Sequence, residues 1–289
     1  MSFFYFNLKH FLFFIFALLF NICRAFSQTP ITVNDHWLFV NVTIQHQGQS
    51  KTVSAPLDTG ASVCLMDSTY AADSCHIHVE SNHTSLSNLV KKRVQAYKIM
   101  MDSIVLGDSV YHDVCCYISD LKSRFRQFTP NFIIGGDVLK RSLWCVDLKQ
   151  NALKRLDAVP AHIQATIQWK NHDDYADAAL NHIYFTGKIA GKKQRILFDT
   201  GSKSNQLPQK CNIASNDSID TFGANVVDSL TKIKVKVARN TPVEFNQQLF
   251  HVDFQMGRSK TLKYPLINSD FLSGQVFVLD YKKKQLYIL

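Results

Sequence analysis

The sequence predicts an all-β protein built from two related lobes, and three observations carry this prediction. Most apolar segments are short, rich in β-branched and aromatic residues, and bounded by turn residues, as β-strands are. The triplet Asp-Thr-Gly occurs twice, at residues 58–60 and 199–201. The segment 132–139 recurs in similar form as the segment 265–272. A long pattern that occurs only twice indicates two lobes rather than a solenoid.

The spacing of the repeated segments indicates a duplication. The two triplets lie 141 residues apart, whereas the downstream segments lie 133 residues apart, so the halves differ by eight residues inside a shared pattern. One Asp-Thr-Gly is expected by chance in roughly one chain in twenty of this length, and two in fewer than about one in a hundred. The two triplets are therefore treated as one functional pair.

The expected strands follow the same order in both halves. In each half a hairpin leads into the triplet, so that Asp58 and Asp199 each stand at the end of a strand. Later hairpins close each half. The expected strands and hairpins are residues 37–44, 51–57, 103–111, 144–147, 183–189, 195–198 and 275–281.

Helices are expected to be few and short. One is predicted near Ser68–Asp73, and others directly after Asp137 and Asp270. At the last two places the aspartate side chain is expected to act as the N-cap.

The first 27 residues have the pattern of a secretory signal peptide. A basic stretch at Lys9 precedes the apolar run 11–20, and the small residues Ala25 and Ser27 predict cleavage before Gln28. An uncleaved membrane anchor is the alternative, but the run is shorter than the roughly 20 residues that span a bilayer. The protein is therefore expected to be exported, either into a periplasm or out of the cell.

The charge excludes an obvious nucleic-acid surface. The whole chain of 289 residues carries a formal charge of +9, and removal of Lys9 and Arg24 with the signal peptide leaves +7. The remaining basic residues are scattered, without the interleaved aromatic residues that bind nucleic acids. We expect a peptide or protein substrate, no nucleic acid, no membrane contact beyond an uncleaved signal segment, and a monomer.

Cysteine chemistry leaves alternatives open. Six cysteines follow residue 27, and export permits disulfides, but six cysteines allow fifteen pairings among which the sequence does not choose. A metal site at Cys75, His76, His78 and His83 is a rival interpretation, because a His-x-His pair on a strand faces one side. No further ligand completes a standard spacing, so no metal is expected.

Two carboxylates brought together have a defined chemistry. Like charges a few ångströms apart do not both ionise readily, so Asp58 and Asp199 would share a proton. The ionised member would activate a water molecule and the protonated member would polarise a peptide carbonyl, with no cofactor. Thr59 and Thr200 are placed to hydrogen-bond across the interface and to hold the two turns in register.

The chain resembles an aspartic peptidase of the retropepsin-like/pepsin-like superfamily. The resemblance is carried by Leu57–Ser62, Phe198–Ser202 and the hydrophobic-hydrophobic-glycine element Ile133–Gly135. It implies two pepsin/retropepsin-like β-barrel lobes with a cleft between them and one active aspartate from each. It also implies an aspartic endopeptidase in which Asp58 and Asp199 are catalytic. The residues expected to support the turns are Thr59, Gly60, Ala61, Thr200, Gly201 and Ser202.

The predicted organisation has four parts. They are a signal peptide at 1–27, an N-terminal lobe at 28–157, an inter-lobe connection at 158–177 and a C-terminal lobe at 178–289.

The chain departs from the family pattern in two places. Asn268 stands where the second half should have the glycine that the first half has at Gly135. No glycine occurs between Gly60 and Gly107, so the usual glycine-tipped flap is missing from the first lobe. A flap is instead expected from about residues 81–97, and a second from residues 220–227.

The residue after each triplet differs between the halves. Ser202 carries a hydroxyl that would donate to Asp199 and favour its charged form, whereas Ala61 has no such group. Asp58 is therefore expected to carry the shared proton more often.

A binding protein is the alternative function. A catalytically weak or inactive pepsin-like protein of the cell envelope would hold peptides without cutting them. Cleavage assays on substitutions of both aspartates distinguish this alternative from an enzyme.

Overall fold

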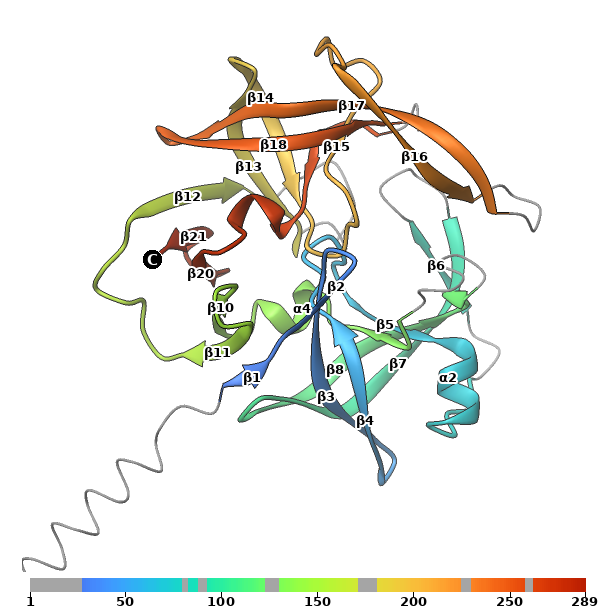
Figure 1. Cartoon of the computed structure of the whole chain (residues 1–289). Helices are drawn as coiled ribbons and strands as arrows, with labels where there is room; N and C mark the ends of the chain where they lie inside the picture. Colours follow the sequence, from blue (N-terminus) through green and yellow to red (C-terminus); the bar gives the residue numbers. More distant parts are fainter. Residues whose placement is uncertain are drawn as a thin grey trace, which may run out of the picture.

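The prediction of an all-β fold is confirmed. The computed structural model describes residues 28–79, 83–87, 93–122, 130–170, 181–224, 230–257 and 262–289, and strands dominate these ranges (Figure 1). The predicted signal peptide lies outside the described residues. The described helices are short, and none is long and apolar enough to cross a membrane. They are α2 (Ser68–Asp73), α4 (Gly136–Leu139) and the 3₁₀ helix η3 (Ser269–Leu272).

An eight-stranded sheet forms most of the first half of the chain. Its strands follow the order β2-β3-β7-β8-β5-β9, with β4 added to β3 and β6 added to β7. Apolar residues alternate along β3 and point into the core, as the period of two requires. The strands are β2 (Thr32–Asn34), β3 (Trp37–His46), β4 (Gln49–Pro56), β5 (Cys64–Asp67), β6 (His83–Ser87), β7 (Arg93–Leu106), β8 (Ser109–Ser119) and β9 (Phe132–Ile133).

A thirteen-stranded sheet contains the second half and also joins the two halves. Its order is β1-β11-β10-β20-β21-β12-β13-β14-β19-β15-β18-β17-β16. The second-half strands are β13 (Ile183–Ile189), β14 (Lys192–Phe198), β15 (Gln206–Leu207), β16 (Asp217–Ala224), β17 (Leu230–Phe245), β18 (Gln248–Met256) and β19 (Leu266–Ile267). The joining strands are β1 (Thr29–Pro30), β10 (Leu143–Asp147), β11 (Ala152–Leu156), β12 (Ala165–Lys170), β20 (Val276–Asp280) and β21 (Gln285–Ile288).

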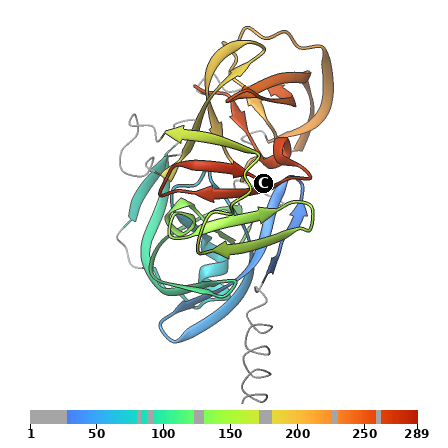
Figure 2. The same cartoon turned by 90° about the vertical axis from the view of Figure 1, so that its left-hand side faces the viewer.

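The joining part of this sheet is built from matching hairpins of the two repeats. Strand β10 pairs with β20 in antiparallel register, with Cys145 opposite Val278, so the end of the first half is hydrogen-bonded to the end of the second. Figure 2 shows these hairpins side by side between the halves. Strand β12 extends the sheet from within the segment expected only to connect the lobes. The halves are therefore connected by a continuous ladder of backbone hydrogen bonds.

The short helices correct one expectation. The N-cap of α2 is Asp67, whose carboxylate accepts from the amides of Thr69 and Tyr70. Neither Asp137 nor Asp270 is an N-cap, however. The cap of α4 is Gly135, without a side-chain bond, and the cap of η3 is Asn268. Asp137 and Asp270 each lie two residues after the N-cap, inside the first turn of the helix.

Both halves carry a long hairpin in the region where a flap was expected. Strand β6 pairs with β7, and β16 pairs with β17. Both hairpins lie on the right-hand side in Figure 1. The tips that connect the paired strands, at residues 88–92 and 225–229, lie outside the described residues.

Candidate active site

Each aspartate directly follows a strand, and a second backbone segment is hydrogen-bonded to the end of that strand. Asp58 follows β4 and its amide donates to the carbonyl of Ile134 at 2.9 Å. Asp199 follows β14 and its amide donates to the carbonyl of Ile267, also at 2.9 Å. The supporting segments run parallel to the strands that they support. The repeated apolar pairs thus lie beneath the repeated triplets.

The two triplets meet so closely that each glycine faces the opposite carboxyl group. A Cβ atom added to Gly60 would lie 2.3 Å from Cγ of Asp199, and one added to Gly201 would lie 2.3 Å from Cγ of Asp58. Real Cβ atoms do not approach other atoms so closely. Glycine is therefore required at both positions because any side chain would occupy the space of a catalytic candidate.

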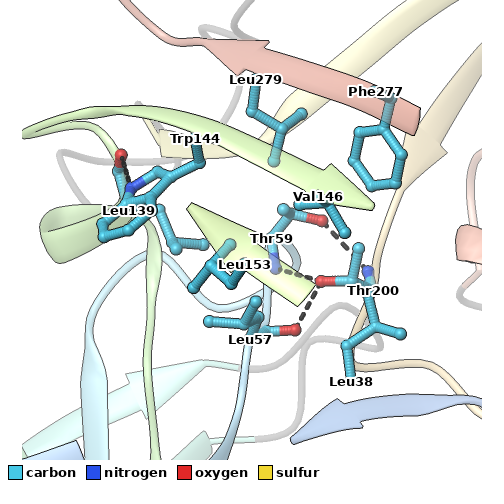
Figure 3. Close-up of a pocket in the computed structure, with 10 residues that line it drawn as sticks. All are labelled: Leu38, Leu57, Thr59, Leu139, Trp144, Val146, Leu153, Thr200, Phe277 and Leu279. Atoms are coloured by element: carbon cyan, nitrogen blue, oxygen red, sulfur yellow. Dashed lines mark hydrogen bonds between the residues drawn. The ribbon is translucent and has the colours of Figure 1, made fainter. Parts of the chain in front are cut away.

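The threonines of the two triplets bind the opposite turn reciprocally (Figure 3). Thr59 Oγ1 donates to the carbonyl of Phe198 at 2.9 Å, and Thr200 Oγ1 donates to the carbonyl of Leu57 at 2.5 Å. Each hydroxyl also accepts from the opposite threonine amide at 3.1 Å. All four bonds are buried, so their net stabilisation is not diluted by competing water.

A small apolar pocket lies next to these threonines. Figure 3 shows side chains from both halves around it, including Leu38, Trp144 and Phe277. The threonine hydrogen bonds are therefore made in apolar surroundings, where a lost partner would leave a polar group unpaired at high cost.

Burial raises the pKa of both carboxyl groups, but to different extents. The pKa of Asp199 is raised well above its ordinary value, first by burial and then by the negative charge of Asp58. The pKa of Asp58 is also raised by burial, but accepted hydrogen bonds oppose that rise. Asp58 Oδ1 accepts from the amides of Gly60 at 2.8 Å and Ala61 at 3.0 Å, whereas among the described residues Asp199 accepts from one backbone amide, that of Gly201 at 2.9 Å.

The backbone amide donors therefore favour the charged form of Asp58 and the protonated form of Asp199, whereas the sequence-based expectation favoured the reverse. That expectation required a hydrogen bond from Ser202 to Asp199. In the structure Ser202 Oγ instead donates to the carbonyl of Ser204 at 2.9 Å. The serine hydroxyl is satisfied within its own turn, and Asp58, with the additional amide donor, is the carboxyl group whose negative charge has more hydrogen-bond donors.

The departure at Asn268 has a local explanation. A Cβ atom at Gly135 would lie 2.2 Å from the carbonyl oxygen of Val63, so the first half requires glycine there. The second half accommodates the fully buried Asn268 side chain by giving it partners. Its side-chain Nδ2 donates to the carbonyl of Ser202 at 3.2 Å. The backbone amide of Asn268 donates to Oδ1 of Asn205 at 2.8 Å.

Sequence reasoning missed two residues that reach the first turn from the second half. Asn181 Nδ2 donates to the carbonyl of Ser62 at 2.7 Å. The neighbouring His182 hydrogen-bonds the backbone of Gly60, and burial lowers its pKa against the opposing effect of that bond. The only sequence signal was a polar pair just before a strand, which is common and therefore uninformative.

The described residues contain no candidate metal centre. No group of three or more His, Cys, Asp or Glu side chains among them is arranged to hold a metal ion. This description includes Cys75, His76, His78 and His83, which were the rival candidate in the sequence. The six cysteines that follow residue 27 are all free thiols in this structure: Cys64, Cys75, Cys115, Cys116, Cys145 and Cys211.

The fold and the paired turns define a class of protein. An all-β chain in which two Asp-Thr-Gly turns meet has a pepsin-like aspartic protease fold. Residues 40–138 match the family model described as aspartyl protease, and this match supports assignment of the chain to the retropepsin-like aspartyl proteases. The matched segment includes Asp58 but not Asp199. A comparison with curated proteins finds no match.

The family match supports a general aspartic protease function, that is, a hydrolase acting on peptide bonds. The catalytic roles of Asp58 and Asp199, and the supporting roles of the other residues in the two turns, stay predictions.

We predict that Ser202→Ala leaves the acidic limb of the pH–rate profile for peptide hydrolysis unchanged. The hydroxyl serves Ser204 rather than Asp199, so its loss should cost only about 1 kcal/mol of unfolding free energy. The pH–rate profiles of the wild-type protein and of Ser202→Ala give the position of the acidic limb, and denaturant titrations of the same two proteins give the unfolding free energies. A shift of the acidic limb would mean that the hydroxyl does act on the Asp199 carboxyl group.

We predict that Asp199→Asn makes the protein more stable at neutral pH and changes its stability little in acid. The raised pKa of Asp199 means that the folded state binds the proton more tightly than the unfolded state. Stability is therefore lost as the pH rises above about 4, where an ordinary aspartate ionises, and asparagine removes this loss.

Unfolding curves of both proteins across this pH range provide the measurement, with the exposed Asp73→Asn as the matched control. An equal effect of Asp199→Asn at acidic and neutral pH would contradict the assignment of the proton.

Proposed function

We propose that the protein is an aspartic endopeptidase that hydrolyses peptide bonds with a water molecule held between Asp58 and Asp199. The observation that carries this proposal is the reciprocal packing of the two turns. Each carboxyl group faces the glycine of the opposite turn, and the two threonine hydroxyls each donate a hydrogen bond to a backbone carbonyl of the opposite half. Two buried carboxyl groups of unequal pKa are what general acid–base hydrolysis needs.

In the proposed mechanism the two aspartates have different roles. The Asp58 carboxylate accepts a proton from the water molecule as the water oxygen attacks the carbonyl carbon of the peptide. Asp199 donates its proton to the carbonyl oxygen, which relieves the developing negative charge. When the tetrahedral intermediate collapses, Asp58 donates its proton to the leaving nitrogen and the C–N bond breaks. A hydroxyl group of the intermediate returns its proton to Asp199 as it becomes the new carbonyl, so the pair again holds one proton.

The amide donors support this division of roles. The amides of Gly60 and Ala61 stabilise negative charge on Asp58 in the resting state. Asp199 has one amide donor and the charge of Asp58 beside it, so it retains its proton in the pH range where Asp58 is ionised.

We predict that the purified protein cleaves members of a peptide library between about pH 3 and about pH 7, and that Asp58→Asn and Asp199→Asn each lower kcat by at least about a hundredfold. A statine-type inhibitor, whose hydroxyl mimics the tetrahedral intermediate, should block cleavage. Asp73→Asn, a carboxylate on the exposed surface, is the control and should cleave normally.

Two outcomes would contradict the proposal in different ways. Cleavage that survives either active-site substitution would exclude the paired-carboxylate mechanism. Inhibitor binding without cleavage of any peptide would favour a pepsin-like peptide-binding protein of the cell envelope.

We also propose that the protein is exported and cleaved between Ser27 and Gln28. The first described strand begins at Thr29, which pairs with Leu153 of β11. Removal of residues 1–27 would therefore leave every described strand intact. The predicted product acts in a periplasm or outside the cell, where its peptide substrates would be other exported proteins.

The predicted cleavage is tested by intact-mass analysis of protein from the exported fraction of a secreting host. We expect a chain that begins at Gln28. A full-length chain that sediments with membranes would instead indicate an uncleaved anchor.

A further inference from the structure

The turn between β2 and β3 belongs to the first half but contacts the second. Asp35 and His36 form this two-residue turn, and both have positive φ angles, of 48° and 70°. Asn34 pairs with Trp37 on either side of it, as in a tight β-hairpin. A two-residue turn fixes the backbone from which both side chains project.

His36 begins a chain of polar contacts that ends at the second catalytic turn. Its Nδ1 lies 2.7 Å from Oδ2 of Asp270. The same Oδ2 atom accepts from Nδ2 of Asn268 at 3.2 Å. Asn268 Nδ2 carries two hydrogens, and the second is donated to the carbonyl of Ser202, also at 3.2 Å. A residue of the first half is thereby connected to the backbone directly after Asp199-Thr-Gly.

A second contact from the same turn reaches the next residue of the second half. Lys203 Nζ lies 2.5 Å from Oδ2 of Asp35 and 5.3 Å from the ring centroid of Trp37. A lysine over an aromatic ring gains further stabilisation from the ring quadrupole. The β2–β3 hairpin therefore contacts the Lys203 side chain directly and is connected to the Ser202 carbonyl through Asp270 and Asn268.

We call the contacts from His36 through Asp270 and Asn268 to the Ser202 carbonyl the relay, and the described residues of the first half have no equivalent of it. Gly135 occupies the place of Asn268 and has no side chain to donate. Asp137, the counterpart of Asp270, accepts from Sγ of Cys64 at 3.3 Å rather than from a histidine. The contact chain is therefore specific to the Asp199 turn, and it exists because Asn268 departs from the glycine found in the other repeat.

We propose that His36 is a positioning residue for the Asp199 turn, acting through Asp270 and Asn268 on the carbonyl of Ser202. This inference rests on the proposed endopeptidase function. The turn presents the Gly201 amide to Asp199, at 2.9 Å, and this is the one backbone amide hydrogen bond that the carboxyl group accepts among the described residues. The Ser202 carbonyl lies two peptide units after this amide, so a hydrogen bond to it restrains the torsion angles of Gly201 and Ser202. Restraining the turn in this way limits the directions of the Gly201 amide and of the Asp199 carboxyl group that accepts from it.

The test compares two substitutions that both preserve the turn. Glycine and asparagine each tolerate a positive φ, so His36→Gly and His36→Asn keep the backbone conformation. Asparagine places a donor at the same side-chain position as Nδ1 of histidine, whereas glycine removes it. The concentration of active sites is measured by titration with a statine-type inhibitor, so that a loss of folded protein does not count as a loss of rate.

We expect His36→Gly to lower kcat about tenfold, because a small misalignment of a reacting group is costly, while KM changes little. His36→Asn should keep kcat within about threefold of the wild-type value, since the donor is retained. An unchanged kcat in His36→Gly, or an equal loss in both variants, would overturn the proposal. His251→Gly is the control, because this exposed histidine lies on β18 and takes no part in the relay.

A double-mutant cycle tests the route through Asn268. Asn268→Gly restores the glycine of the first half and removes the middle of the relay. If His36 acts through Asn268, adding His36→Gly to Asn268→Gly lowers kcat no further. Multiplicative losses would show that the two residues act independently and would overturn the relay.

The same assays separate this inference from the proposed function. If the wild-type protein does not cleave peptides, or if Asp199→Asn still does, the endopeptidase proposal fails. If the wild-type protein cleaves, Asp199→Asn does not, and His36→Gly matches the wild type, only the positioning role fails.

Discussion

The burial of two carboxyl groups against each other is the constraint on which the rest of the structure depends. Burial penalises negative charge, so the pair of Asp58 and Asp199 is tolerated only because one member holds a proton and both accept backbone hydrogen bonds. The absence of side chains at Gly60 and Gly201 and the reciprocal threonine bonds follow from this close approach. The joining sheet, in which β10 pairs with β20, holds the two turns at that separation.

The duplicated chain produces an unequal pair. The two carboxyl groups differ in their backbone donors: Asp58 accepts from the amides of Gly60 and Ala61, whereas Asp199 accepts from that of Gly201. The Ser202 hydroxyl bonds within its own turn. The larger difference between the halves lies beneath the turns, where Gly135 leaves room for a backbone carbonyl and Asn268 fills the corresponding place with a hydrogen-bonded amide. The two copies of the motif therefore differ in the hydrogen bonds that their carboxyl groups accept and in the groups that pack beneath them.

Much of this architecture could be predicted from the sequence. The strand pattern, the repeat and the two triplets indicated an all-β fold of two related lobes, and the all-β fold is confirmed. The N-caps assigned to Asp137 and Asp270 were wrong, because cap assignment depends on where a strand ends, and sequence patterns locate strand ends only within a few residues. Asn181 and His182 were missed because their hydrogen bonds to Ser62 and Gly60 form only where the two halves pack together.

The sequence by itself determined which residues could pair: a period of two specifies strands, and a motif repeated at matching places specifies two equivalent turns. Only the tertiary structure decided which backbone amides each aspartate accepts from and which polar contacts surround its turn. The physical reason is that a polar side chain bonds to the nearest partner that satisfies it. For Ser202 that partner is two residues away, whereas for His36 it lies in the other half of the chain. A contact between the halves, such as that of His36 with Asp270, exists only where the joining sheet brings the two halves together.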